Sequence, residues 1–371
     1  MEAAVTAIYP AAMPATKNRG KDQINWSDDV WKRIDTAVTD EMTRTRVGAK
    51  FLPLVHVPKK VTTVASDVVI VPNQGDTDQA LRVDESQTTR VNEVWIEFLL
   101  TPPQVENEVS EEMAMSQGQS CSTGVTLGLR SGNSLALGED TVIFNGQNAF
   151  NSALFAPGGL VQFRDPNLKT NLDVGLLNIR SDGSVALPSN QIVLVPPADQ
   201  GPPPRYQENT LDAVAEAFST LQGLGHYEHY ALVLNTVPYA DLHTALKTTL
   251  ITPIEPISHI VKAGIYGTAT LPPFDGRTAG LPKTLPQGVS LNGTKILYTG
   301  VLVSLAGNTM DLVRGRMDTD SGGKDLDVAT IFNQKDQNEN YRFRVAERFA
   351  LRLKDPTAVI LLLFLDKPIG Q

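Results

Sequence analysis

The chain has a single cysteine, Cys121, among its 371 residues. This count excludes an intrachain disulfide and any metal site built from several cysteines. The most apolar run covers only residues 358–365, whereas a helix that crosses a membrane needs about 20 apolar residues. The sequence therefore predicts a protein without disulfides, without a cysteine-bound metal and without a membrane span.

An excess of positive charge is also missing. The chain has 32 Lys and Arg against 41 Asp and Glu, which gives a net charge of −9. A dedicated nucleic-acid-binding protein concentrates Lys and Arg to displace counterions, so this balance argues against sequence-specific binding of nucleic acid. The 28 Gly and 24 Pro favour many short elements over a long helical bundle.

Sequence motifs of catalysis are absent as well. The chain contains no G-x-S-x-G, no phosphate-binding P-loop and no G-x-G-x-x-G. His226 and His229 are three residues apart, but the glycine before them indicates a turn rather than a metal-binding helix. Glu139 and Asp140 are adjacent, and adjacent helical residues point about 100° apart, so we interpret them as structural. We expect no catalytic residue, no metal, no cofactor and no enzymatic activity.

One helix is predicted strongly, over residues 28–46. Ser27 supplies an N-cap, and Asp28 and Asp29 place negative charge in the first turn. Apolar residues then recur at spacings of three and four, which puts them on one face of the helix. These residues are Trp31, Ile34, Val38 and Met42.

A long polar stretch follows. Residues 62–71 and 90–100 have strand composition, and the segment between them is charged and rich in turn formers. Two strands around a polar tip predict an extended hairpin with too few apolar residues to hold itself folded. We expect it to lie on a neighbouring subunit.

Residues 105–146 have a helical pattern with three glycines four residues apart, Gly124, Gly128 and Gly132. On a helix they would share one face and permit close approach of another backbone, at a cost of up to about 1 kcal/mol each relative to Ala. The alternative is a loop broken by these glycines.

The second half of the chain predicts an α/β layer. A helix beginning near Asn209, a buried strand at 231–234 and a helix at 239–246 follow one another. Near the end, residues 341–353 alternate arginines with apolar residues, which predicts a strand with one wet face. Residues 358–365 are continuously apolar, which predicts a strand buried on both faces.

The order of these pieces resembles the encapsulin (linocin-type) family of shell proteins, which shares the HK97 fold of tailed-phage major capsid proteins. The resemblance covers residues 27–366 and depends on several segments in a shared order. They are WSDDVWKRID at 26–35, LALGEDTVIFNG at 135–146, HYALVLNTVPYADLH at 229–243 and YRFRVAERFALRLKDPTAVILL at 341–362.

The resemblance implies an α+β, HK97-like capsid fold with four parts. An N-terminal arm would comprise residues 1–26, and an extension loop residues 59–94. The peripheral domain would combine 27–58 (first helix), 95–155 (with the spine helix) and 315–354. The axial domain would combine 156–314 with the closing strand, 355–371.

The function that the resemblance implies is self-assembly of a major capsid protein into an icosahedral shell around a double-stranded DNA phage genome. The expected partners are many further copies of the chain, in pentamers and hexamers, with portal, scaffold or decoration proteins. DNA would be enclosed without sequence-specific binding, and no membrane would be involved. The expected location is the virion, assembled in the host bacterial cytoplasm. The chain is longer than typical encapsulins, with surplus at 1–26, 185–209, 272–288 and 316–324, which favours a capsid.

The alternative is an encapsulin nanocompartment in the bacterial cytoplasm that encloses a cargo enzyme. In that family a short cargo peptide docks beside the first helix, and the matching positions here are Trp31, Ile34 and Val38. Packing of these three residues within their own domain is the competing interpretation. For contacts between subunits, the resemblance indicates charged residues of the extension loop, namely Asp76, Asp78, Arg82, Asp84, Glu85 and Arg90.

Overall fold

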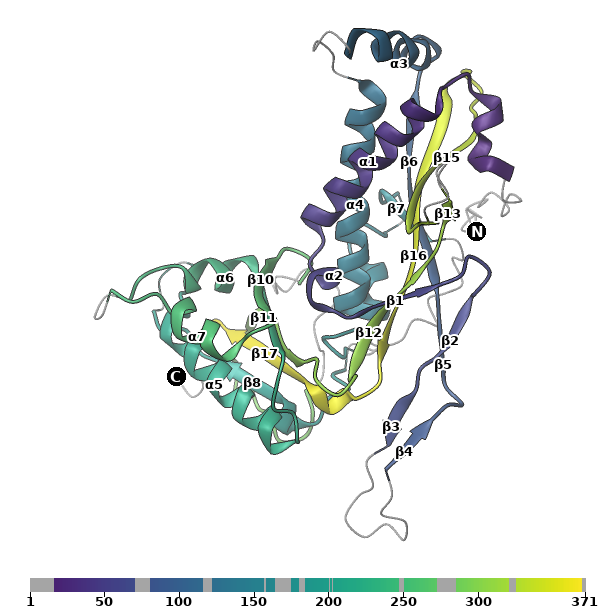
Figure 1. The fold of residues 1–371 in the computed structure, drawn as a ribbon. Helices are drawn as coiled ribbons and strands as arrows, with labels where there is room; N and C mark the ends of the chain where they lie inside the picture. Colours follow the sequence, from purple (N-terminus) through teal and green to yellow (C-terminus); the bar gives the residue numbers. More distant parts are fainter. Residues whose placement is uncertain are drawn as a thin grey trace, which may run out of the picture.

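The computed structural model describes residues 17–70, 81–115, 122–156, 158–163, 175–179, 184–199, 201, 203–246, 250–271, 285–319 and 325–368. Two sheets organise the described part of the chain, and a separate hairpin leaves the body beside them (Figure 1). The predicted residues Cys121, Asp76 and Asp78 lie outside the described residues.

The first sheet is mostly antiparallel and has six strands. Its path is β1 (Leu54–Val57), β12 (Met310–Gly315), β16 (Tyr341–Leu353), β6 (Asn92–Leu100) and β7 (Val161–Phe163), and β15 (Val328–Lys335) also pairs with β16. The long strand β16 has the bounds that the alternating sequence predicts. It is central because β6 covers one of its edges while β12 and β15 share the other.

Two helices cover one face of this sheet. They are α1 (Asp28–Thr45) and α4 (Thr123–Asn145), which lie side by side in Figure 1. The prediction of a helix at 28–46 is confirmed, and Ser27 caps it by accepting a hydrogen bond from the Val30 amide. Two further helices lie near the ends of α1. They are α2 (Gly48–Phe51), which follows α1 in the chain, and α3 (Pro102–Met115).

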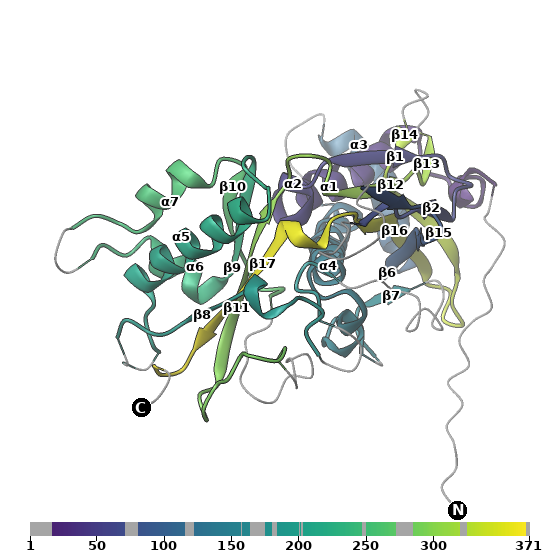
Figure 2. The same cartoon turned by 90° about the horizontal axis from the view of Figure 1, so that it is seen from below.

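The second sheet has five strands in the order β10 (Gly264–Thr268), β9 (Tyr230–Asn235), β11 (Ile296–Ser304), β17 (Val359–Leu365) and β8 (Ile192–Val195). Figure 2 shows the helices α5 (Gln207–Gly223), α6 (Thr236–Leu242) and α7 (Ile254–Ile260) gathered on one side of it. The other face of the sheet contributes to the core shared with the first sheet. All seven residues of β17 are buried, as its continuous apolar sequence predicts.

Some predicted boundaries differ from the structure. The helix expected at 239–246 begins three residues earlier, because Asn235 caps it by accepting a hydrogen bond from the Val237 amide. The expected axial segment 156–314 includes β7 and nearly all of β12, yet both strands pair within the first sheet. The segment 185–209, expected to be surplus, contains β8, which pairs with β17 in the second sheet.

The hairpin consists of two short ladders. β2 (Thr63–Ala65) pairs with β5 (Thr88–Arg90), and β3 (Val68–Ile70) pairs with β4 (Arg82–Asp84). The prediction of one continuous strand over 62–71 is wrong, because Asp67 adopts a left-handed backbone conformation with φ of +51°. This residue interrupts the extended chain between β2 and β3.

Candidate assembly surfaces

Helices α1 and α4 approach each other closely at Gly124, Gly128 and Gly132 of α4. All three glycines are buried. A Cβ at Gly128 would lie 3.2 Å from methyl groups of Ile34 and Val38, and a Cβ at Gly132 would lie 2.9 Å from the Val38 carbonyl oxygen. The helical interpretation of this segment is therefore confirmed over the glycine-broken loop. The result is a stiff two-helix layer behind the first sheet.

The N-terminus of α4 is fixed by a buried carboxylate of α3. Ser122 accepts a hydrogen bond from the Val125 amide, and its own hydroxyl donates to Glu108 at 2.5 Å. The other oxygen of Glu108 accepts from the Gly124 amide at 2.7 Å. Because amides at a helix N-terminus lack partners within the helix, these contacts stabilise the start of α4.

The predicted cargo-binding residues lie inside the protein. Trp31, Ile34 and Val38 are at most 1% exposed, and the Trp31 ring packs 6.0 Å from Phe343 of β16. This burial fits the interpretation in which they pack the helix on its own domain, and a role in binding a cargo peptide stays a prediction. The exposed side chains of α1 are all polar. They are Asp28, Asp29, Lys32, Thr36, Thr39, Asp40, Thr43 and Arg44.

The hairpin formed by β2 to β5, which the resemblance predicts to be the extension loop, exposes several apolar side chains. Its side chains Leu81, Val83 and Ile70 are 72%, 53% and 41% exposed. Of the predicted charged contacts, Arg82 and Glu85 are exposed, and Asp84 and Arg90 are half-buried. Asp84 accepts hydrogen bonds from the amide and hydroxyl of Ser86, which lower its pKa. Asp84 therefore shapes the turn before β5.

A cluster of buried charges joins α4 to the first sheet. Glu139 of α4 accepts a hydrogen bond from Arg314 of β12 at 2.5 Å, and Arg46 lies 3.7 Å from its other oxygen. Glu347 of β16 is 2% exposed, and burial together with the charge of Glu139 raises its pKa well above the usual value. The sequence interpretation of Glu139 as structural agrees with this position in the core.

Asp140, the neighbour of Glu139, points elsewhere. Its two oxygens accept hydrogen bonds from the Val47 and Gly48 amides, both at 2.8 Å, at the start of α2. Burial, followed by the charge of Glu139, raises its pKa to about 7. The two carboxylates thus serve different partners and do not form an acid/base pair.

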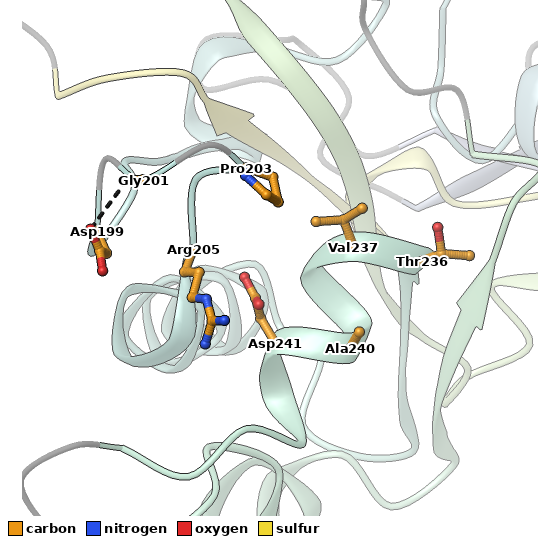
Figure 3. Close-up of a pocket in the computed structure, with 8 residues that line it drawn as sticks. All are labelled: Asp199, Gly201, Pro203, Arg205, Thr236, Val237, Ala240 and Asp241. Carbon is orange, nitrogen blue, oxygen red and sulfur yellow. Dashed lines mark hydrogen bonds between the residues drawn. The ribbon is translucent and has the colours of Figure 1, made fainter.

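A pocket of about 400 Å³ lies beside α6, in the layer of helices that covers the second sheet (Figure 3). Asp241 is committed to structure, because it accepts a hydrogen bond from the Tyr206 amide at 3.0 Å, and burial raises its pKa. The lining residues are Asp199, Gly201, Pro203, Arg205, Thr236, Val237, Ala240 and Asp241.

The two neighbouring histidines also have separate surroundings. His226 is buried and lies 2.9 Å from the Thr357 hydroxyl, whereas His229 is exposed. Within the described ranges, no group of three or more His, Cys, Asp or Glu side chains could hold a metal ion. The same residues include no helix long and apolar enough to cross a membrane.

Comparison with known proteins identifies the architecture. A family model described as encapsulating protein for peroxidase matches residues 193–274, which run from β8 to just beyond β10. A solved virus-like particle from Pyrococcus furiosus is 14% identical, with 89% of this chain and 98% of that chain covered at a TM-score of 0.52. The chain has an HK97-like fold.

Other solved structures with lower TM-scores match most of the chain as well. The mature capsid of bacteriophage PhiM1 is 13% identical over 86% of this chain and 87% of its own, at a TM-score of 0.43. The holo-SrpI encapsulin complex from Synechococcus elongatus is 11% identical over 88% and 90%, at a TM-score of 0.42. The predicted resemblance to shell proteins of this fold is confirmed by the family model and by the virus-like particle.

Within the HK97-like fold, the sequence analysis missed the role of the arginines in β16. It predicted one wet face for this strand, yet no residue of β16 is exposed. The prediction is wrong because Arg348 is covered by the start of the extension loop, while Arg344 packs over the Trp95 ring at 4.2 Å. The sequence did contain a signal that these arginines act together. Their even-numbered spacing places Arg342, Arg344, Arg348 and Arg352 on the same face of the strand.

Proposed function

We propose that the chain is a shell subunit that self-assembles into a closed icosahedral particle, with pentamers and hexamers of the same chain as building units. The HK97-like fold supports this function. The extension loop supports it independently, because two short ladders bury little apolar surface of their own. Such a loop is stable in one pose only when it lies against another surface.

The loop's exposed apolar side chains provide the driving force for this contact. Fully burying one Leu, Val or Ile side chain contributes about 1.5–3 kcal/mol. The exposed fractions of Leu81, Val83 and Ile70 would together supply about 2–5 kcal/mol at each loop contact. One such contact is weak, but every subunit of a closed shell both offers a loop and receives one.

We propose a double-stranded DNA genome as the content of the shell, which makes the chain a phage major capsid protein located in the virion. The net charge of −9 supports this content, because an acidic wall confines DNA without adsorbing it tightly. The polar exposed face of α1 also supports it, since that face offers no apolar groove for a cargo tail. Portal, scaffold or decoration proteins would be the accessory partners.

The second candidate is a nanocompartment that encloses a cargo enzyme. The match of residues 193–274 to the family described as encapsulating protein for peroxidase favours it. The integration of β8 into the second sheet favours it too, because part of the expected surplus at 185–209 is then core structure.

Electron microscopy of the purified full chain tests the shared proposal, and the particle content separates the two candidates. Hollow particles of uniform diameter are expected, with nuclease-protected DNA inside those isolated from the native host. A co-purifying enzyme with a short apolar C-terminal tail, and no protected DNA, would decide for the nanocompartment. A stable monomer at micromolar concentration, without particles under any solution condition, would contradict both.

A further inference from the structure

Two arginines of β16 hold the main chain of the extension loop. Both terminal nitrogens of the Arg348 guanidinium donate hydrogen bonds to backbone carbonyls, Nη1 to Lys59 and Nη2 to Val61. Arg348 is 7% exposed, so these bonds are shielded from water. The grip is on carbonyl oxygens and does not depend on which side chains the loop carries.

Arg352 acts at the interruption between β2 and β3. Its Nη1 donates to the Ala65 carbonyl at 3.1 Å and lies 3.3 Å from Asp67 Oδ2. Its Nε and Nη2 donate to the two oxygens of Asp311, both at 2.7 Å. Asp311 is 1% exposed and also accepts from Lys354. Arg352 is thus fixed by a buried carboxylate before it reaches the loop.

Among the described residues of the hairpin, the contacted segment lies where the two ladders are interrupted. Asp67 separates the two ladders with φ of +51°, and β2 and β3 pair with different partners. Just beyond it, the Val69 amide donates to the Lys354 carbonyl at 2.7 Å. Contacts from residues 348, 352 and 354 therefore flank this interruption on both sides.

The same residues mark the crossover between the two sheets. The Lys354 and Asp355 amides both donate to the Thr309 carbonyl at 2.9 Å, directly before β12 begins and after β16 ends. The loop and the turn that connects the first sheet to β17 therefore share Lys354 as a hydrogen-bonding residue.

We propose that Arg348 and Arg352 are positioning residues that set the direction in which the extension loop leaves the body, and so which site on a neighbouring subunit the loop reaches. This inference rests on the proposed shell function, because the loop direction matters only when a second copy receives it. In a closed shell, an incorrect loop angle would change the curvature between neighbours and broaden the distribution of particle diameters.

Hydrogen exchange of the unassembled full chain tests the grip directly. The variants are Arg348→Gln, Arg352→Gln and Asp67→Asn, the last a gentle change because Asn tolerates the left-handed conformation and the Asp67 side chain is 41% exposed. The matched control is Arg342→Gln, which removes an ion pair with Glu97 from the same strand without touching the loop. Particle diameters after assembly are then measured by cryo-electron microscopy.

The arginine variants are expected to accelerate exchange in peptides covering residues 61–70 about tenfold or more, since each loses charge-assisted bonds to the loop. Asp67→Asn should accelerate it about two- to threefold. Arg342→Gln should leave these peptides unchanged. Shells of the arginine variants should vary in diameter. Arg352→Gln should also lower the unfolding midpoint of the subunit below that of the control, because the buried Asp311 loses one of its two cationic partners.

Unchanged exchange at 61–70 in both arginine variants would overturn the proposal whatever the shells look like. If these variants lose stability throughout the chain, Asp67→Asn decides, and an unchanged loop in that variant overturns the proposal. A looser loop with particles of normal diameter and yield would remove the role in assembly. If even the unmodified chain forms no particles, the proposed shell function fails, and the exchange comparison still decides whether the arginines hold the loop.

Discussion

Substitution of Gly132 by Ala tests the close approach of α4 to α1. The new Cβ would lie 2.9 Å from the Val38 carbonyl oxygen and 3.3 Å from Val38 Cα, both backbone atoms that move only if the helices separate. Overpacking of this kind costs about 1–3 kcal/mol, and Ala returns up to about 1 kcal/mol of helix propensity. We therefore expect a net loss of about 1–2 kcal/mol in the free energy of unfolding.

Gly128→Ala is the matched control on the same face of the same helix. Its Cβ would meet side-chain methyl groups at 3.2 Å, while the nearest backbone atom, the Ile34 carbonyl oxygen, is at an ordinary contact distance of 3.8 Å, so only a small side-chain shift is needed. The gain in helix propensity then offsets the contact, so the change should lie within about 1 kcal/mol of zero.

Urea unfolding of the unassembled subunit, followed by tryptophan fluorescence, measures both variants. Two of the three tryptophans report on this region, because the Trp26 ring stacks on Phe343 with ring centres 4.9 Å apart and Trp31 lies beside them. Gly132→Ala should shift the midpoint to lower urea with an unchanged slope, and Gly128→Ala should not. The reasoning is refuted if Gly132→Ala is as stable as the unmodified chain, or if Gly128→Ala is the more damaging of the two.

Three further predictions concern the buried carboxyl group of Glu347, the N-cap of α4 and the apolar side chains of the extension loop. Burial raises the folded-state pKa of Glu347 above its ordinary 4.5, so its contribution to stability is present below that pH and is lost as the pH rises toward the folded pKa. Glu347→Gln should therefore reduce the fall in the urea midpoint between pH 5 and pH 8, and an undiminished fall would contradict this. Ser122→Ala should cost about 1–2 kcal/mol in urea unfolding, because the Val125 amide and Glu108 lose their partner, whereas Ser122→Thr should restore most of it. The double variant Leu81→Asp, Val83→Asp should fold with an unchanged midpoint yet form no particles in electron micrographs, and a normal yield would show that the loop's apolar side chains are not buried on assembly.

The sequence predicted those parts of the fold whose signals are local. Period and capping placed α1 almost to the residue, and the alternation of residues 341–353 gave the bounds of β16. The continuous apolar run gave β17. Each of these patterns depends on residues within one element, so a single sequence suffices to recognise it.

The errors have a common physical origin in contacts between distant segments. Asp67 interrupts the expected strand where Arg352 bonds to it, although the two are far apart in sequence. On the face of β16 that was expected to be wet, Arg348 is covered by residues 59–61 and Arg344 packs over Trp95. The assignment of β12 to the first sheet likewise depends on its pairing with β16 and β1. No local pattern encodes which distant segment will cover a surface.

The candidate site divides in the same way. The sequence indicated an extension loop that needs a partner surface, but it directed attention to the loop's charges, while the exposed apolar residues Leu81 and Val83 are the stronger source of binding free energy. The residues at the base of the loop were missed because arginines on a strand ordinarily indicate a solvent-facing side. Their role became visible only with the carbonyl groups that they contact.

Strand β16 connects the two regions on which assembly would depend. Consecutive residues of a strand point to opposite faces, so Glu347 faces the charge cluster with Glu139 on α4 while Arg348 grips the base of the extension loop. A displacement of β16 would therefore disturb both at once. Arg348 is buried and bonded to the base of the hairpin, and a buried charge that loses its partners is costly, commonly by about 3–5 kcal/mol, so the strand resists such displacement. Strand β16 thus links helix α4 to the base of the hairpin, where Arg352 contacts Asp67 at the interruption between the two ladders.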